Sequence, residues 1–225
     1  MKLFRSFPPL VLLILVAGSS GDLAAGQRSS RTPASRSEEL AREKWQRVDD
    51  ILARLQVKPG SVVADLGAGG GFFTARLSQA VGPAGHVYAV DVSDQAIRGL
   101  QWRVDNGALT NVDVVRSEAD DPKLPAAALD GVLIVNAYHE MRSHQEILEG
   151  IRKALKPGGR LVLVEPTAKD RPGSTREEQA RAHIIALGLA LDDLQAANFQ
   201  VLEQAEDFVN RPNDEAEWLV VAEPR

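Results

Sequence analysis

VVADLGAGGGFF, residues Val62–Phe73, is the stretch that decides the fold. A short apolar run reaches an acid, Asp65, and then enters a loop in which glycines alternate with small residues. Glycine adopts positive φ and lets a ligand approach the backbone with no Cβ in the way. A buried strand followed by such a loop and a helix is typical of an open α/β sheet, which binds ligands beyond the carboxyl ends of its strands.

Two ligand classes use a loop of this kind. A dinucleotide site requires the pattern GxGxxG, whose third glycine allows the helix to pack closely on the strand. Counted from Gly67, that third position holds Phe72, which would crowd the pyrophosphate. The alternative ligand is a nucleoside with a short amino-acid arm, whose ammonium group Asp65 would receive directly or through water. A plain glycine-rich turn, with Asp91 as a helix cap, is a third interpretation.

The rest of the chain alternates apolar β-branched runs with helical patterns. This alternation predicts a doubly wound, Rossmann-like α/β fold with a seven-stranded, mostly parallel sheet and one antiparallel edge strand. Strands are expected at 61–66, 85–92, 111–117, 129–138, 160–166, 199–209 and 217–223. Helices are expected at 72–81, 93–109, 144–159 and 175–198, the last with a break near Gly188.

The N-terminal residues have the pattern of a secretory signal. Lys2 and Arg5 precede an apolar run from Leu10 to Ala17, and small residues follow. We therefore predict a signal peptide at 1–26, a disordered tether at 27–36 and a single domain at 37–225 that opens with a leader helix at 38–56. The protein is expected to be exported, to the periplasm or the medium. An uncleaved signal that tethers it to the membrane is the alternative.

Composition excludes several classes of site. The formal net charge is −5, so the basic face of a nucleic-acid-binding domain is not expected. The chain has no cysteine, which removes disulfides, thiolate nucleophiles and cysteine-ligated metals. Its 4 histidines show no HxxxH or HExxH spacing, so no metal site is predicted. We expect a small-molecule partner, and no stable membrane insertion once the signal is removed.

Four motifs together resemble a known family. VVADLGAGGG, VYAVDVS, LDGVLIVNAYHEM and LKPGGRLVLVEP are similar to the first, acidic, fourth-strand and fifth-strand motifs of class I S-adenosylmethionine-dependent methyltransferases. The combination with a signal peptide resembles a group of small exported bacterial methyltransferase-like proteins. The resemblance implies S-adenosylmethionine as cofactor and methyl transfer to an unidentified, small-molecule acceptor.

The resemblance also implies roles for individual residues. Asp65 and the loop glycines would line the methionine arm, Asp91 would bind the ribose, and Asn136 would lie beneath the sulfonium. Val92 and one or more residues of SEAD would contact the adenine. The cofactor-binding candidates are Asp65, Gly67, Gly69, Gly71, Asp91, Val92, Glu118, Ala119, Asp120 and Asn136.

Catalytic candidates lie in NAYHE, beyond the fourth strand. His139 is a candidate general base with a pKa near 6.5 if unperturbed, and Tyr138 is a candidate wall around the methyl group. The alternative is that both residues only pack beneath a lid. The stretch 171–183 is the expected acceptor-side lid, and its arginines suit either solvent or an anionic acceptor.

Other interpretations of the function remain open. Trp45 and Gln46 belong either to the core or to a leader helix that covers the cofactor. The protein is alternatively a binding module that keeps the nucleoside pocket without turnover. An NAD-dependent oxidoreductase is disfavoured by Phe72 and by the lack of a Ser/Tyr/Lys catalytic set.

Overall fold

A computed structural model describes residues 36–107, 109–169, 171–212 and 215–225. The predicted signal peptide, 1–26, lies outside the described residues, as does the predicted tether apart from Arg36. Within the described segments, no helix is both long and apolar enough to cross a membrane.

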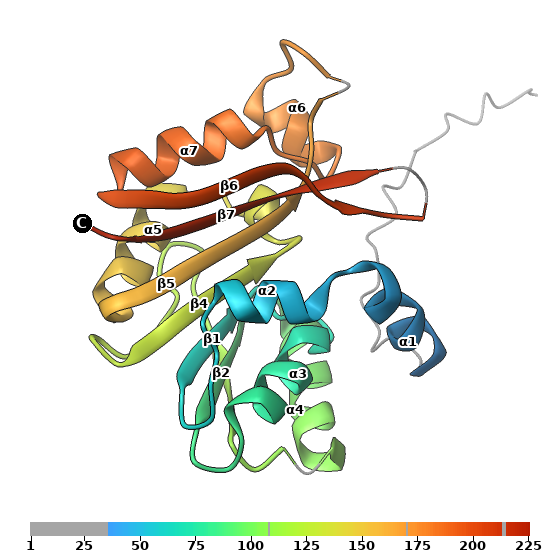
Figure 1. Cartoon of the computed structure of the whole chain (residues 1–225), viewed down its shortest axis with the longest axis vertical. Coiled ribbons are helices and arrows are strands. Elements are labelled where there is room, and N and C mark those ends of the chain that lie inside the picture. Colours follow the sequence, from blue (N-terminus) through green and yellow to red (C-terminus); the bar gives the residue numbers. More distant parts are fainter. Residues whose placement is uncertain (1–35, 108, 170, 213–214) are drawn as a thin grey trace, which may run out of the picture. The chain divides into compact units, whose positions relative to one another are not determined.

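The core of the domain is a seven-stranded sheet with the order β3-β2-β1-β4-β5-β7-β6 (Figure 1). The first five strands pair in parallel, and β7 pairs antiparallel with both β5 and β6. The predicted α/β fold is therefore confirmed, although the antiparallel strand lies one place in from the edge. The strands are β1 (Val62–Leu66), β2 (His86–Asp91), β3 (Val112–Arg116), β4 (Leu129–Val135), β5 (Leu155–Pro166), β6 (Phe199–Asn210) and β7 (Ala216–Pro224).

Helices cover both faces of the sheet (Figure 1). Because successive strand residues point to opposite faces, each central strand contributes to two separate cores. On β4, for example, Ile134 packs with the first core and Leu133 with the second. The first core includes α5 (His144–Ala154) and α7 (Leu187–Ala196). The second includes α2 (Val48–Arg54), α3 (Phe72–Val81) and α4 (Asp94–Gly107).

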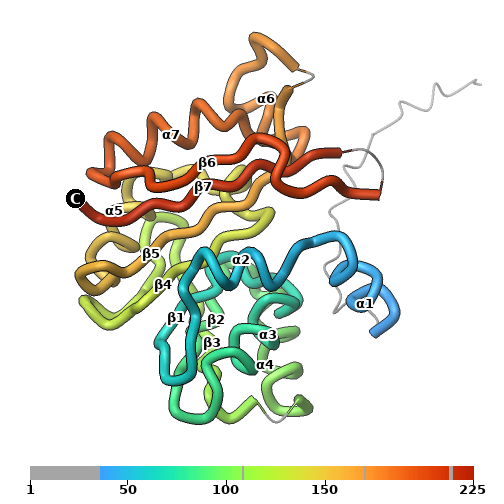
Figure 2. Tube along the Cα trace, viewed as in Figure 1, coloured from blue at the N-terminus to red at the C-terminus, as the bar shows by residue number. Residues whose placement is uncertain are grey.

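The predicted single leader helix is wrong, because the leader forms two helices. α1 (Arg36–Trp45) ends at Trp45, and two residues separate it from α2, which begins at Val48 (Figure 2). Between them Arg47 has a left-handed φ of 54°. Its guanidinium lies 4.2 Å from the centre of the Phe208 ring and donates to the Phe208 carbonyl. These contacts with a distant strand offset the backbone strain, which a local helical pattern does not reveal.

The predicted helix at 175–198 is also divided, but before Gly188. α6 (Arg176–Arg181) and α7 are separated by residues 182–186. The side chain of Gln179 accepts a hydrogen bond from the Ala186 amide at 2.7 Å, and the Ile185 amide donates to Pro166 at 3.1 Å. Because of these bonds, the amides of Ile185 and Ala186 are satisfied although the linker is not helical. Within the linker, His183 has a left-handed φ of 57°.

Candidate functional site

The glycine loop after β1 has the backbone geometry that only glycine adopts readily. Gly67, Gly69 and Gly71 have φ values of 76°, 55° and 76°. A Cβ on Gly67 would lie 2.3 Å from the Cβ of Ala137, too close for any side chain. Gly71 immediately precedes α3, so the loop turns over the end of β1 and enters that helix.

Asp91, at the end of β2, holds this loop in place. Its carboxylate is 7% exposed and accepts hydrogen bonds from the amides of Gly69 and Ser93, both at 2.9 Å. Neither amide belongs to α4 (Asp94–Gly107), so these bonds are not the helix cap considered from sequence. An ionised carboxylate offers about four acceptor positions, so Asp91 keeps capacity for a pair of ribose hydroxyls.

A cavity of about 240 Å³ opens over the loop. It is lined by several of the predicted cofactor residues, among them Asp65, Gly67, Gly69 and Asn136. The full lining is Glu39, Arg42, Asp65, Gly67, Ala68, Gly69, Gly70, Phe72, Phe73, Val135 and Asn136. The structure thus brings together strand ends that lie far apart in the sequence.

Asp65 is a buried carboxylate in this cavity. It is 3% exposed and accepts a hydrogen bond from the Thr74 hydroxyl at 2.6 Å. Burial raises the pKa of Asp65 to about 6, against the opposing effects of the Thr74 bond and nearby Arg42. A buried charge of this kind favours a cationic ligand group, because the ligand restores the stabilisation that water no longer supplies.

Arg42 of α1 supplies a cation to the same cavity, a role that the local sequence around it does not indicate. Its guanidinium lies 4.2 Å from the centre of the Phe72 ring, and its Nε donates to Gln46 at 2.8 Å. Burial lowers the pKa of Arg42 to about 10, so it remains charged at neutral pH. With Asp65, it gives the cavity one anion and one cation, which complement the two charges of an α-amino acid.

A buried carboxylate, Glu217 of β7, connects α1 to the end of β4. Its oxygens accept from Asn136 at 2.9 Å, from Arg211 at 2.7 Å and from Gln46 at 2.7 Å. Gln46 in turn accepts from Arg42. Gln46 therefore belongs to the buried polar interior, and Trp45 packs against the second core.

The predicted adenine contacts lie at the open side of the loop. Val92 is 52% exposed, and Glu118, Ala119 and Asp120 are exposed in the segment after β3. The Ser117 amide donates to the Asp91 carbonyl at 3.1 Å, which keeps this segment beside the end of β2. None of these four residues lines the cavity, and their contact with adenine stays a prediction.

Tyr138 and His139 form the short 3₁₀ helix η1 (Tyr138–Glu140) and do not line the glycine-loop cavity. Tyr138 is fully buried, and its hydroxyl donates to Asp193 of α7 at 2.8 Å. Its ring packs in the core, which does not support a wall around the methyl group. Tyr138 is therefore a packing residue in this structure.

His139 is held by a carboxylate. Its Nδ1 lies 2.6 Å from Glu165 of β5, and its side chain is buried. Burial alone would lower the pKa of His139, but the attraction of Glu140 and Glu165 outweighs it and raises the pKa to about 9. The imidazole is then protonated at neutral pH, so the pH dependence expected of an unperturbed base does not apply.

A second cavity, of about 540 Å³, opens beside η1. We call it the acceptor-side cavity; it is lined by His139, Glu140, Met141, Arg142, His144, Arg176, Glu177, Ala180 and Arg181. Arg176 is already bound by Asp193, at 2.8 and 3.0 Å. Of the lid arginines considered from sequence, Arg171 and Arg181 are exposed.

Comparison with known proteins agrees with this geometry. Residues 63–159 match a family model described as a methyltransferase domain. This segment therefore resembles a methyltransferase domain, as its sequence motifs predict. The expected cofactor, S-adenosylmethionine, is confirmed.

Curated relatives of this methyltransferase domain include "Ubiquinone/menaquinone biosynthesis C-methyltransferase UbiE" of Pasteurella multocida. The two are 34% identical over 110 residues, which cover 48% of this chain and 41% of that protein. The Ectopseudomonas mendocina protein of the same name is 31% identical over 52% of this chain and 46% of its own. The chain therefore spans less than half the length of these relatives.

Solved structures share the fold. A "SAM dependent methyltransferase" from Aquifex aeolicus superposes with a TM-score of 0.69 at 24% identity, over 84% of this chain and 98% of that one. Geranyl diphosphate C-methyltransferase from Streptomyces coelicolor, in complex with S-adenosyl-L-homocysteine, gives 0.66 at 13% identity, over 80% and 76%.

The charge on Asp65 predicts a pH-dependent affinity for the cofactor product. S-adenosylhomocysteine binding should weaken as pH falls through about 6, because protonation removes the negative charge that attracts the ammonium group. The loss should approach about tenfold per pH unit. Calorimetry between pH 5 and 8 measures it. Asp65→Asn should bind weakly with no such slope, and a wild-type affinity that stays constant from pH 7 to 5 would contradict the assignment.

Arg42 should contribute to binding through its charge. Arg42→Met keeps an apolar side chain against Phe72 but removes the cation, and we expect S-adenosylhomocysteine affinity to fall about 10- to 100-fold, as for loss of a charged hydrogen bond. Lys44→Met, an exposed change on the same helix, is the matched control and should alter affinity less than twofold. Equal effects of the two changes in calorimetry would remove Arg42 from the site.

Proposed function

We propose that the protein transfers the methyl group of S-adenosylmethionine to a small-molecule acceptor. The observation that carries this proposal is the pairing of buried Asp65 with Arg42 over the glycine loop. A cofactor with an amino-acid arm presents an ammonium and a carboxylate group on the same carbon, which match both charges, whereas a dinucleotide has no such pair. Asp91, bound to the loop through Gly69, is in position for the ribose.

The acceptor-side cavity supports a small acceptor. Its volume of about 540 Å³ is in the usual range for small-molecule sites, roughly 300–1,000 Å³. Asn136 lines the cofactor cavity and His139 lines this one, so only two residues separate them along the chain. Methyl transfer requires the nucleophile, methyl carbon and sulfur to lie in line, so the proposal requires the two cavities to meet at residues 136–139 when cofactor and acceptor are bound.

The protein forms no covalent bond in this reaction; it positions the two reactants. A nucleophilic atom of the acceptor attacks the methyl carbon, the carbon–sulfur bond breaks, and its electron pair stays on sulfur to give S-adenosylhomocysteine. The acceptor then loses a proton if it carried one. His139 as proton acceptor stays a prediction, and it would first have to release the proton that Glu140 and Glu165 stabilise.

The relatives suggest one class of acceptor to test first. They are named as C-methyltransferases of ubiquinone and menaquinone biosynthesis, which makes quinol rings reasonable acceptors for this chain. However, the family match ends at residue 159, before the lid residues of the acceptor-side cavity. Acceptor choice therefore depends on residues outside the matched segment.

Turnover distinguishes an enzyme from a binding module. The protein is incubated with S-adenosylmethionine and a panel of quinols, phenols, amines and carboxylates, and S-adenosylhomocysteine is measured by mass spectrometry. We expect the product with only some of the acceptors. Gly67→Ala should abolish it, since the new Cβ meets Ala137 at 2.3 Å. Gly158→Ala is the matched control, because Gly158 has a similar φ of 78° with open space around it. Tight cofactor binding without turnover on any acceptor would favour the module.

We also propose that the protein works outside the cytoplasm, on the basis of its N-terminal sequence. Intact mass of the protein from cell fractions should show a mature chain that begins between about Ser20 and Gln27, in the periplasm or medium. Recovery of the full-length chain from the cytosol alone would contradict export.

A further inference from the structure

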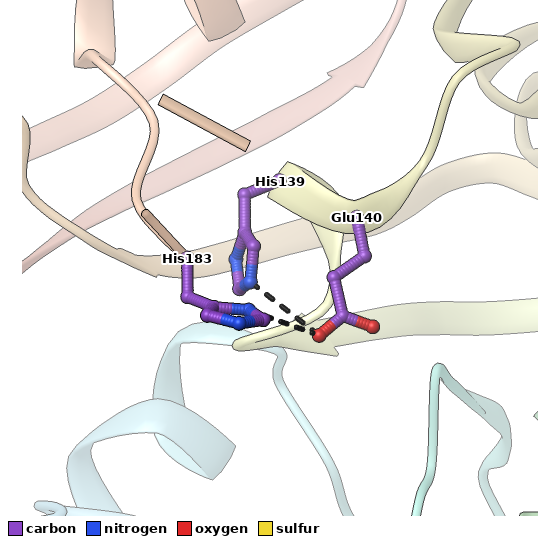
Figure 3. A group of neighbouring side chains, drawn as sticks. All are labelled: His139, Glu140 and His183. Atoms are coloured by element: carbon purple, nitrogen blue, oxygen red, sulfur yellow. Dashed lines mark ion pairs between the residues drawn. The ribbon is translucent and has the colours of Figure 1, made fainter. Parts of the chain in front are cut away.

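Two histidines and a glutamate converge beside the acceptor-side cavity (Figure 3). One oxygen of Glu140, Oε1, lies 3.7 Å from His139 Nε2 and 3.5 Å from His183 Nδ1. One ligand atom from each of the three side chains lies within 4.8 Å of the others. His139 and Glu140 come from η1, whereas His183 comes from the linker between α6 and α7.

His139 gives an independent indication that a ligand belongs here. The residue is 4% exposed, and its Nε2 atom is buried with no hydrogen-bond partner among the described residues. Leaving a buried polar atom without a partner costs about 1–3 kcal/mol, so such atoms in native proteins call for a physical explanation. The atom faces the carboxylate of Glu140 and the ring of His183 (Figure 3).

Glu165 orients His139 in the way that metal-binding histidines are oriented. Its Oε2 lies 2.6 Å from His139 Nδ1, and its Oε1 accepts from the amides of Ala137 and Tyr138, both at 2.7 Å. In the neutral imidazole, a carboxylate bound to Nδ1–H fixes the tautomer in which Nε2 carries the lone pair, so a metal ion would displace the proton that Glu140 and Glu165 stabilise. Carboxylate–histidine pairs of this kind recur around protein metal ions.

The backbone also directs His183 toward the cluster. A φ of 57° is unusual for a residue other than glycine, and the side chain of His183 lies against η1, with its Nδ1 3.5 Å from Glu140 Oε1. The rings of His183 and His139 meet edge to face, with centres 5.6 Å apart. The two segments are therefore already arranged as a ligand set.

We propose that His139, Glu140 and His183 bind a divalent transition-metal ion through Nε2, a carboxylate oxygen and Nδ1. Mixed imidazole and carboxylate ligands suit zinc, cobalt, nickel or iron, whereas calcium and magnesium prefer oxygen alone. In a tetrahedral zinc site with bonds near 2.0–2.1 Å, ligand atoms lie about 3.3 Å apart. The separations of 3.5 and 3.7 Å from Glu140 differ from this by a few tenths of an ångström. The two imidazole nitrogens lie within 4.8 Å of each other, and the exposed His183 side chain would move to bring them to bonding distance of one ion.

The sequence alone did not predict this site because its histidines are 44 positions apart (183 − 139 = 44). The fold brings them together when the linker after α6 returns past the end of β4. Three protein ligands leave one coordination position for water or a substrate atom. His139 and Glu140 line the acceptor-side cavity, so that position is available to a molecule in it.

The metal would have two consequences for the protein. It would bind the linker after α6 to η1, which fixes one wall of the acceptor-side cavity. It would also occupy the Nε2 lone pair of His139, and this excludes His139 as a general base while the metal is bound. The site itself does not depend on methyl transfer, and it can be tested without an acceptor.

Cobalt and zinc titrations test the proposal directly. Tag-free protein is treated with EDTA, exchanged into metal-free buffer and titrated with Zn²⁺ by calorimetry and with Co²⁺ by visible absorption. We expect one ion per chain and the intense d–d bands of a four- or five-coordinate cobalt site. A thermal shift to higher Tm on addition of Zn²⁺ should accompany binding, because the ion binds only the folded ligand set.

Variants identify the ligands. His183→Ala and Glu140→Gln should each weaken Zn²⁺ binding at least tenfold and change the cobalt spectrum. His86→Ala is the matched control, because His86 is another surface histidine that pairs with a single carboxylate, Asp113, at 3.0 Å. This change should leave affinity within twofold of wild type. Circular dichroism confirms that each variant is folded.

Two results would overturn the proposal. One is the absence of stoichiometric binding at micromolar Zn²⁺ in folded wild-type protein. The other is equal binding by the wild type, His183→Ala and Glu140→Gln. S-adenosylhomocysteine affinity, measured on the same metal-free samples, should be unchanged in His183→Ala, so failure of the metal site is distinguishable from failure of the cofactor site.

Discussion

The cofactor site depends on one buried carboxylate, Glu217, which lies on the last strand of the domain. Glu217 is fully buried and accepts hydrogen bonds from three side chains, those of Gln46, Asn136 and Arg211. A buried carboxylate is stable only when its oxygens are satisfied in this way. The same bonds place the end of the leader and the end of β4 beside each other, and Gln46 then positions Arg42 over the glycine loop.

A second buried carboxylate, Glu165, holds neighbouring groups in place on the other face of the sheet. Glu165 of β5 pairs in register with Trp218, the neighbour of Glu217 on β7. Adjacent residues of a strand face opposite sides of the sheet. Glu217 therefore faces the side covered by α2 and α3, and Glu165 faces the side covered by α5 and α7. One carboxylate therefore organises the cofactor side, and the other organises η1 and the acceptor-side cavity.

The fold could be predicted from sequence because its signals are local. The apolar runs, the glycine loop and the acids at strand ends all depend on residues close together in the chain. The helix breaks at Arg47 and at residues 182–186 could not be predicted from sequence, because they depend on contacts with Phe208, Pro166 and other distant residues. Arg42 and the two buried glutamates were missed for the same reason. The signal for the glutamates was present, as single acids in the apolar runs LVLVEP and AEWLVV.

A crystal structure of the protein with S-adenosylhomocysteine tests the account most directly. We expect the ligand in the glycine-loop cavity, with its ammonium group beside Asp65, its carboxylate within hydrogen-bonding distance of Arg42 and its ribose hydroxyls on Asp91. The leader should keep the bonds of Gln46 and Asn136 to Glu217. A ligand bound elsewhere, or one bound at the loop with α1 displaced and Arg42 in solvent, would contradict the central claim that Glu217 and the leader complete the cofactor site.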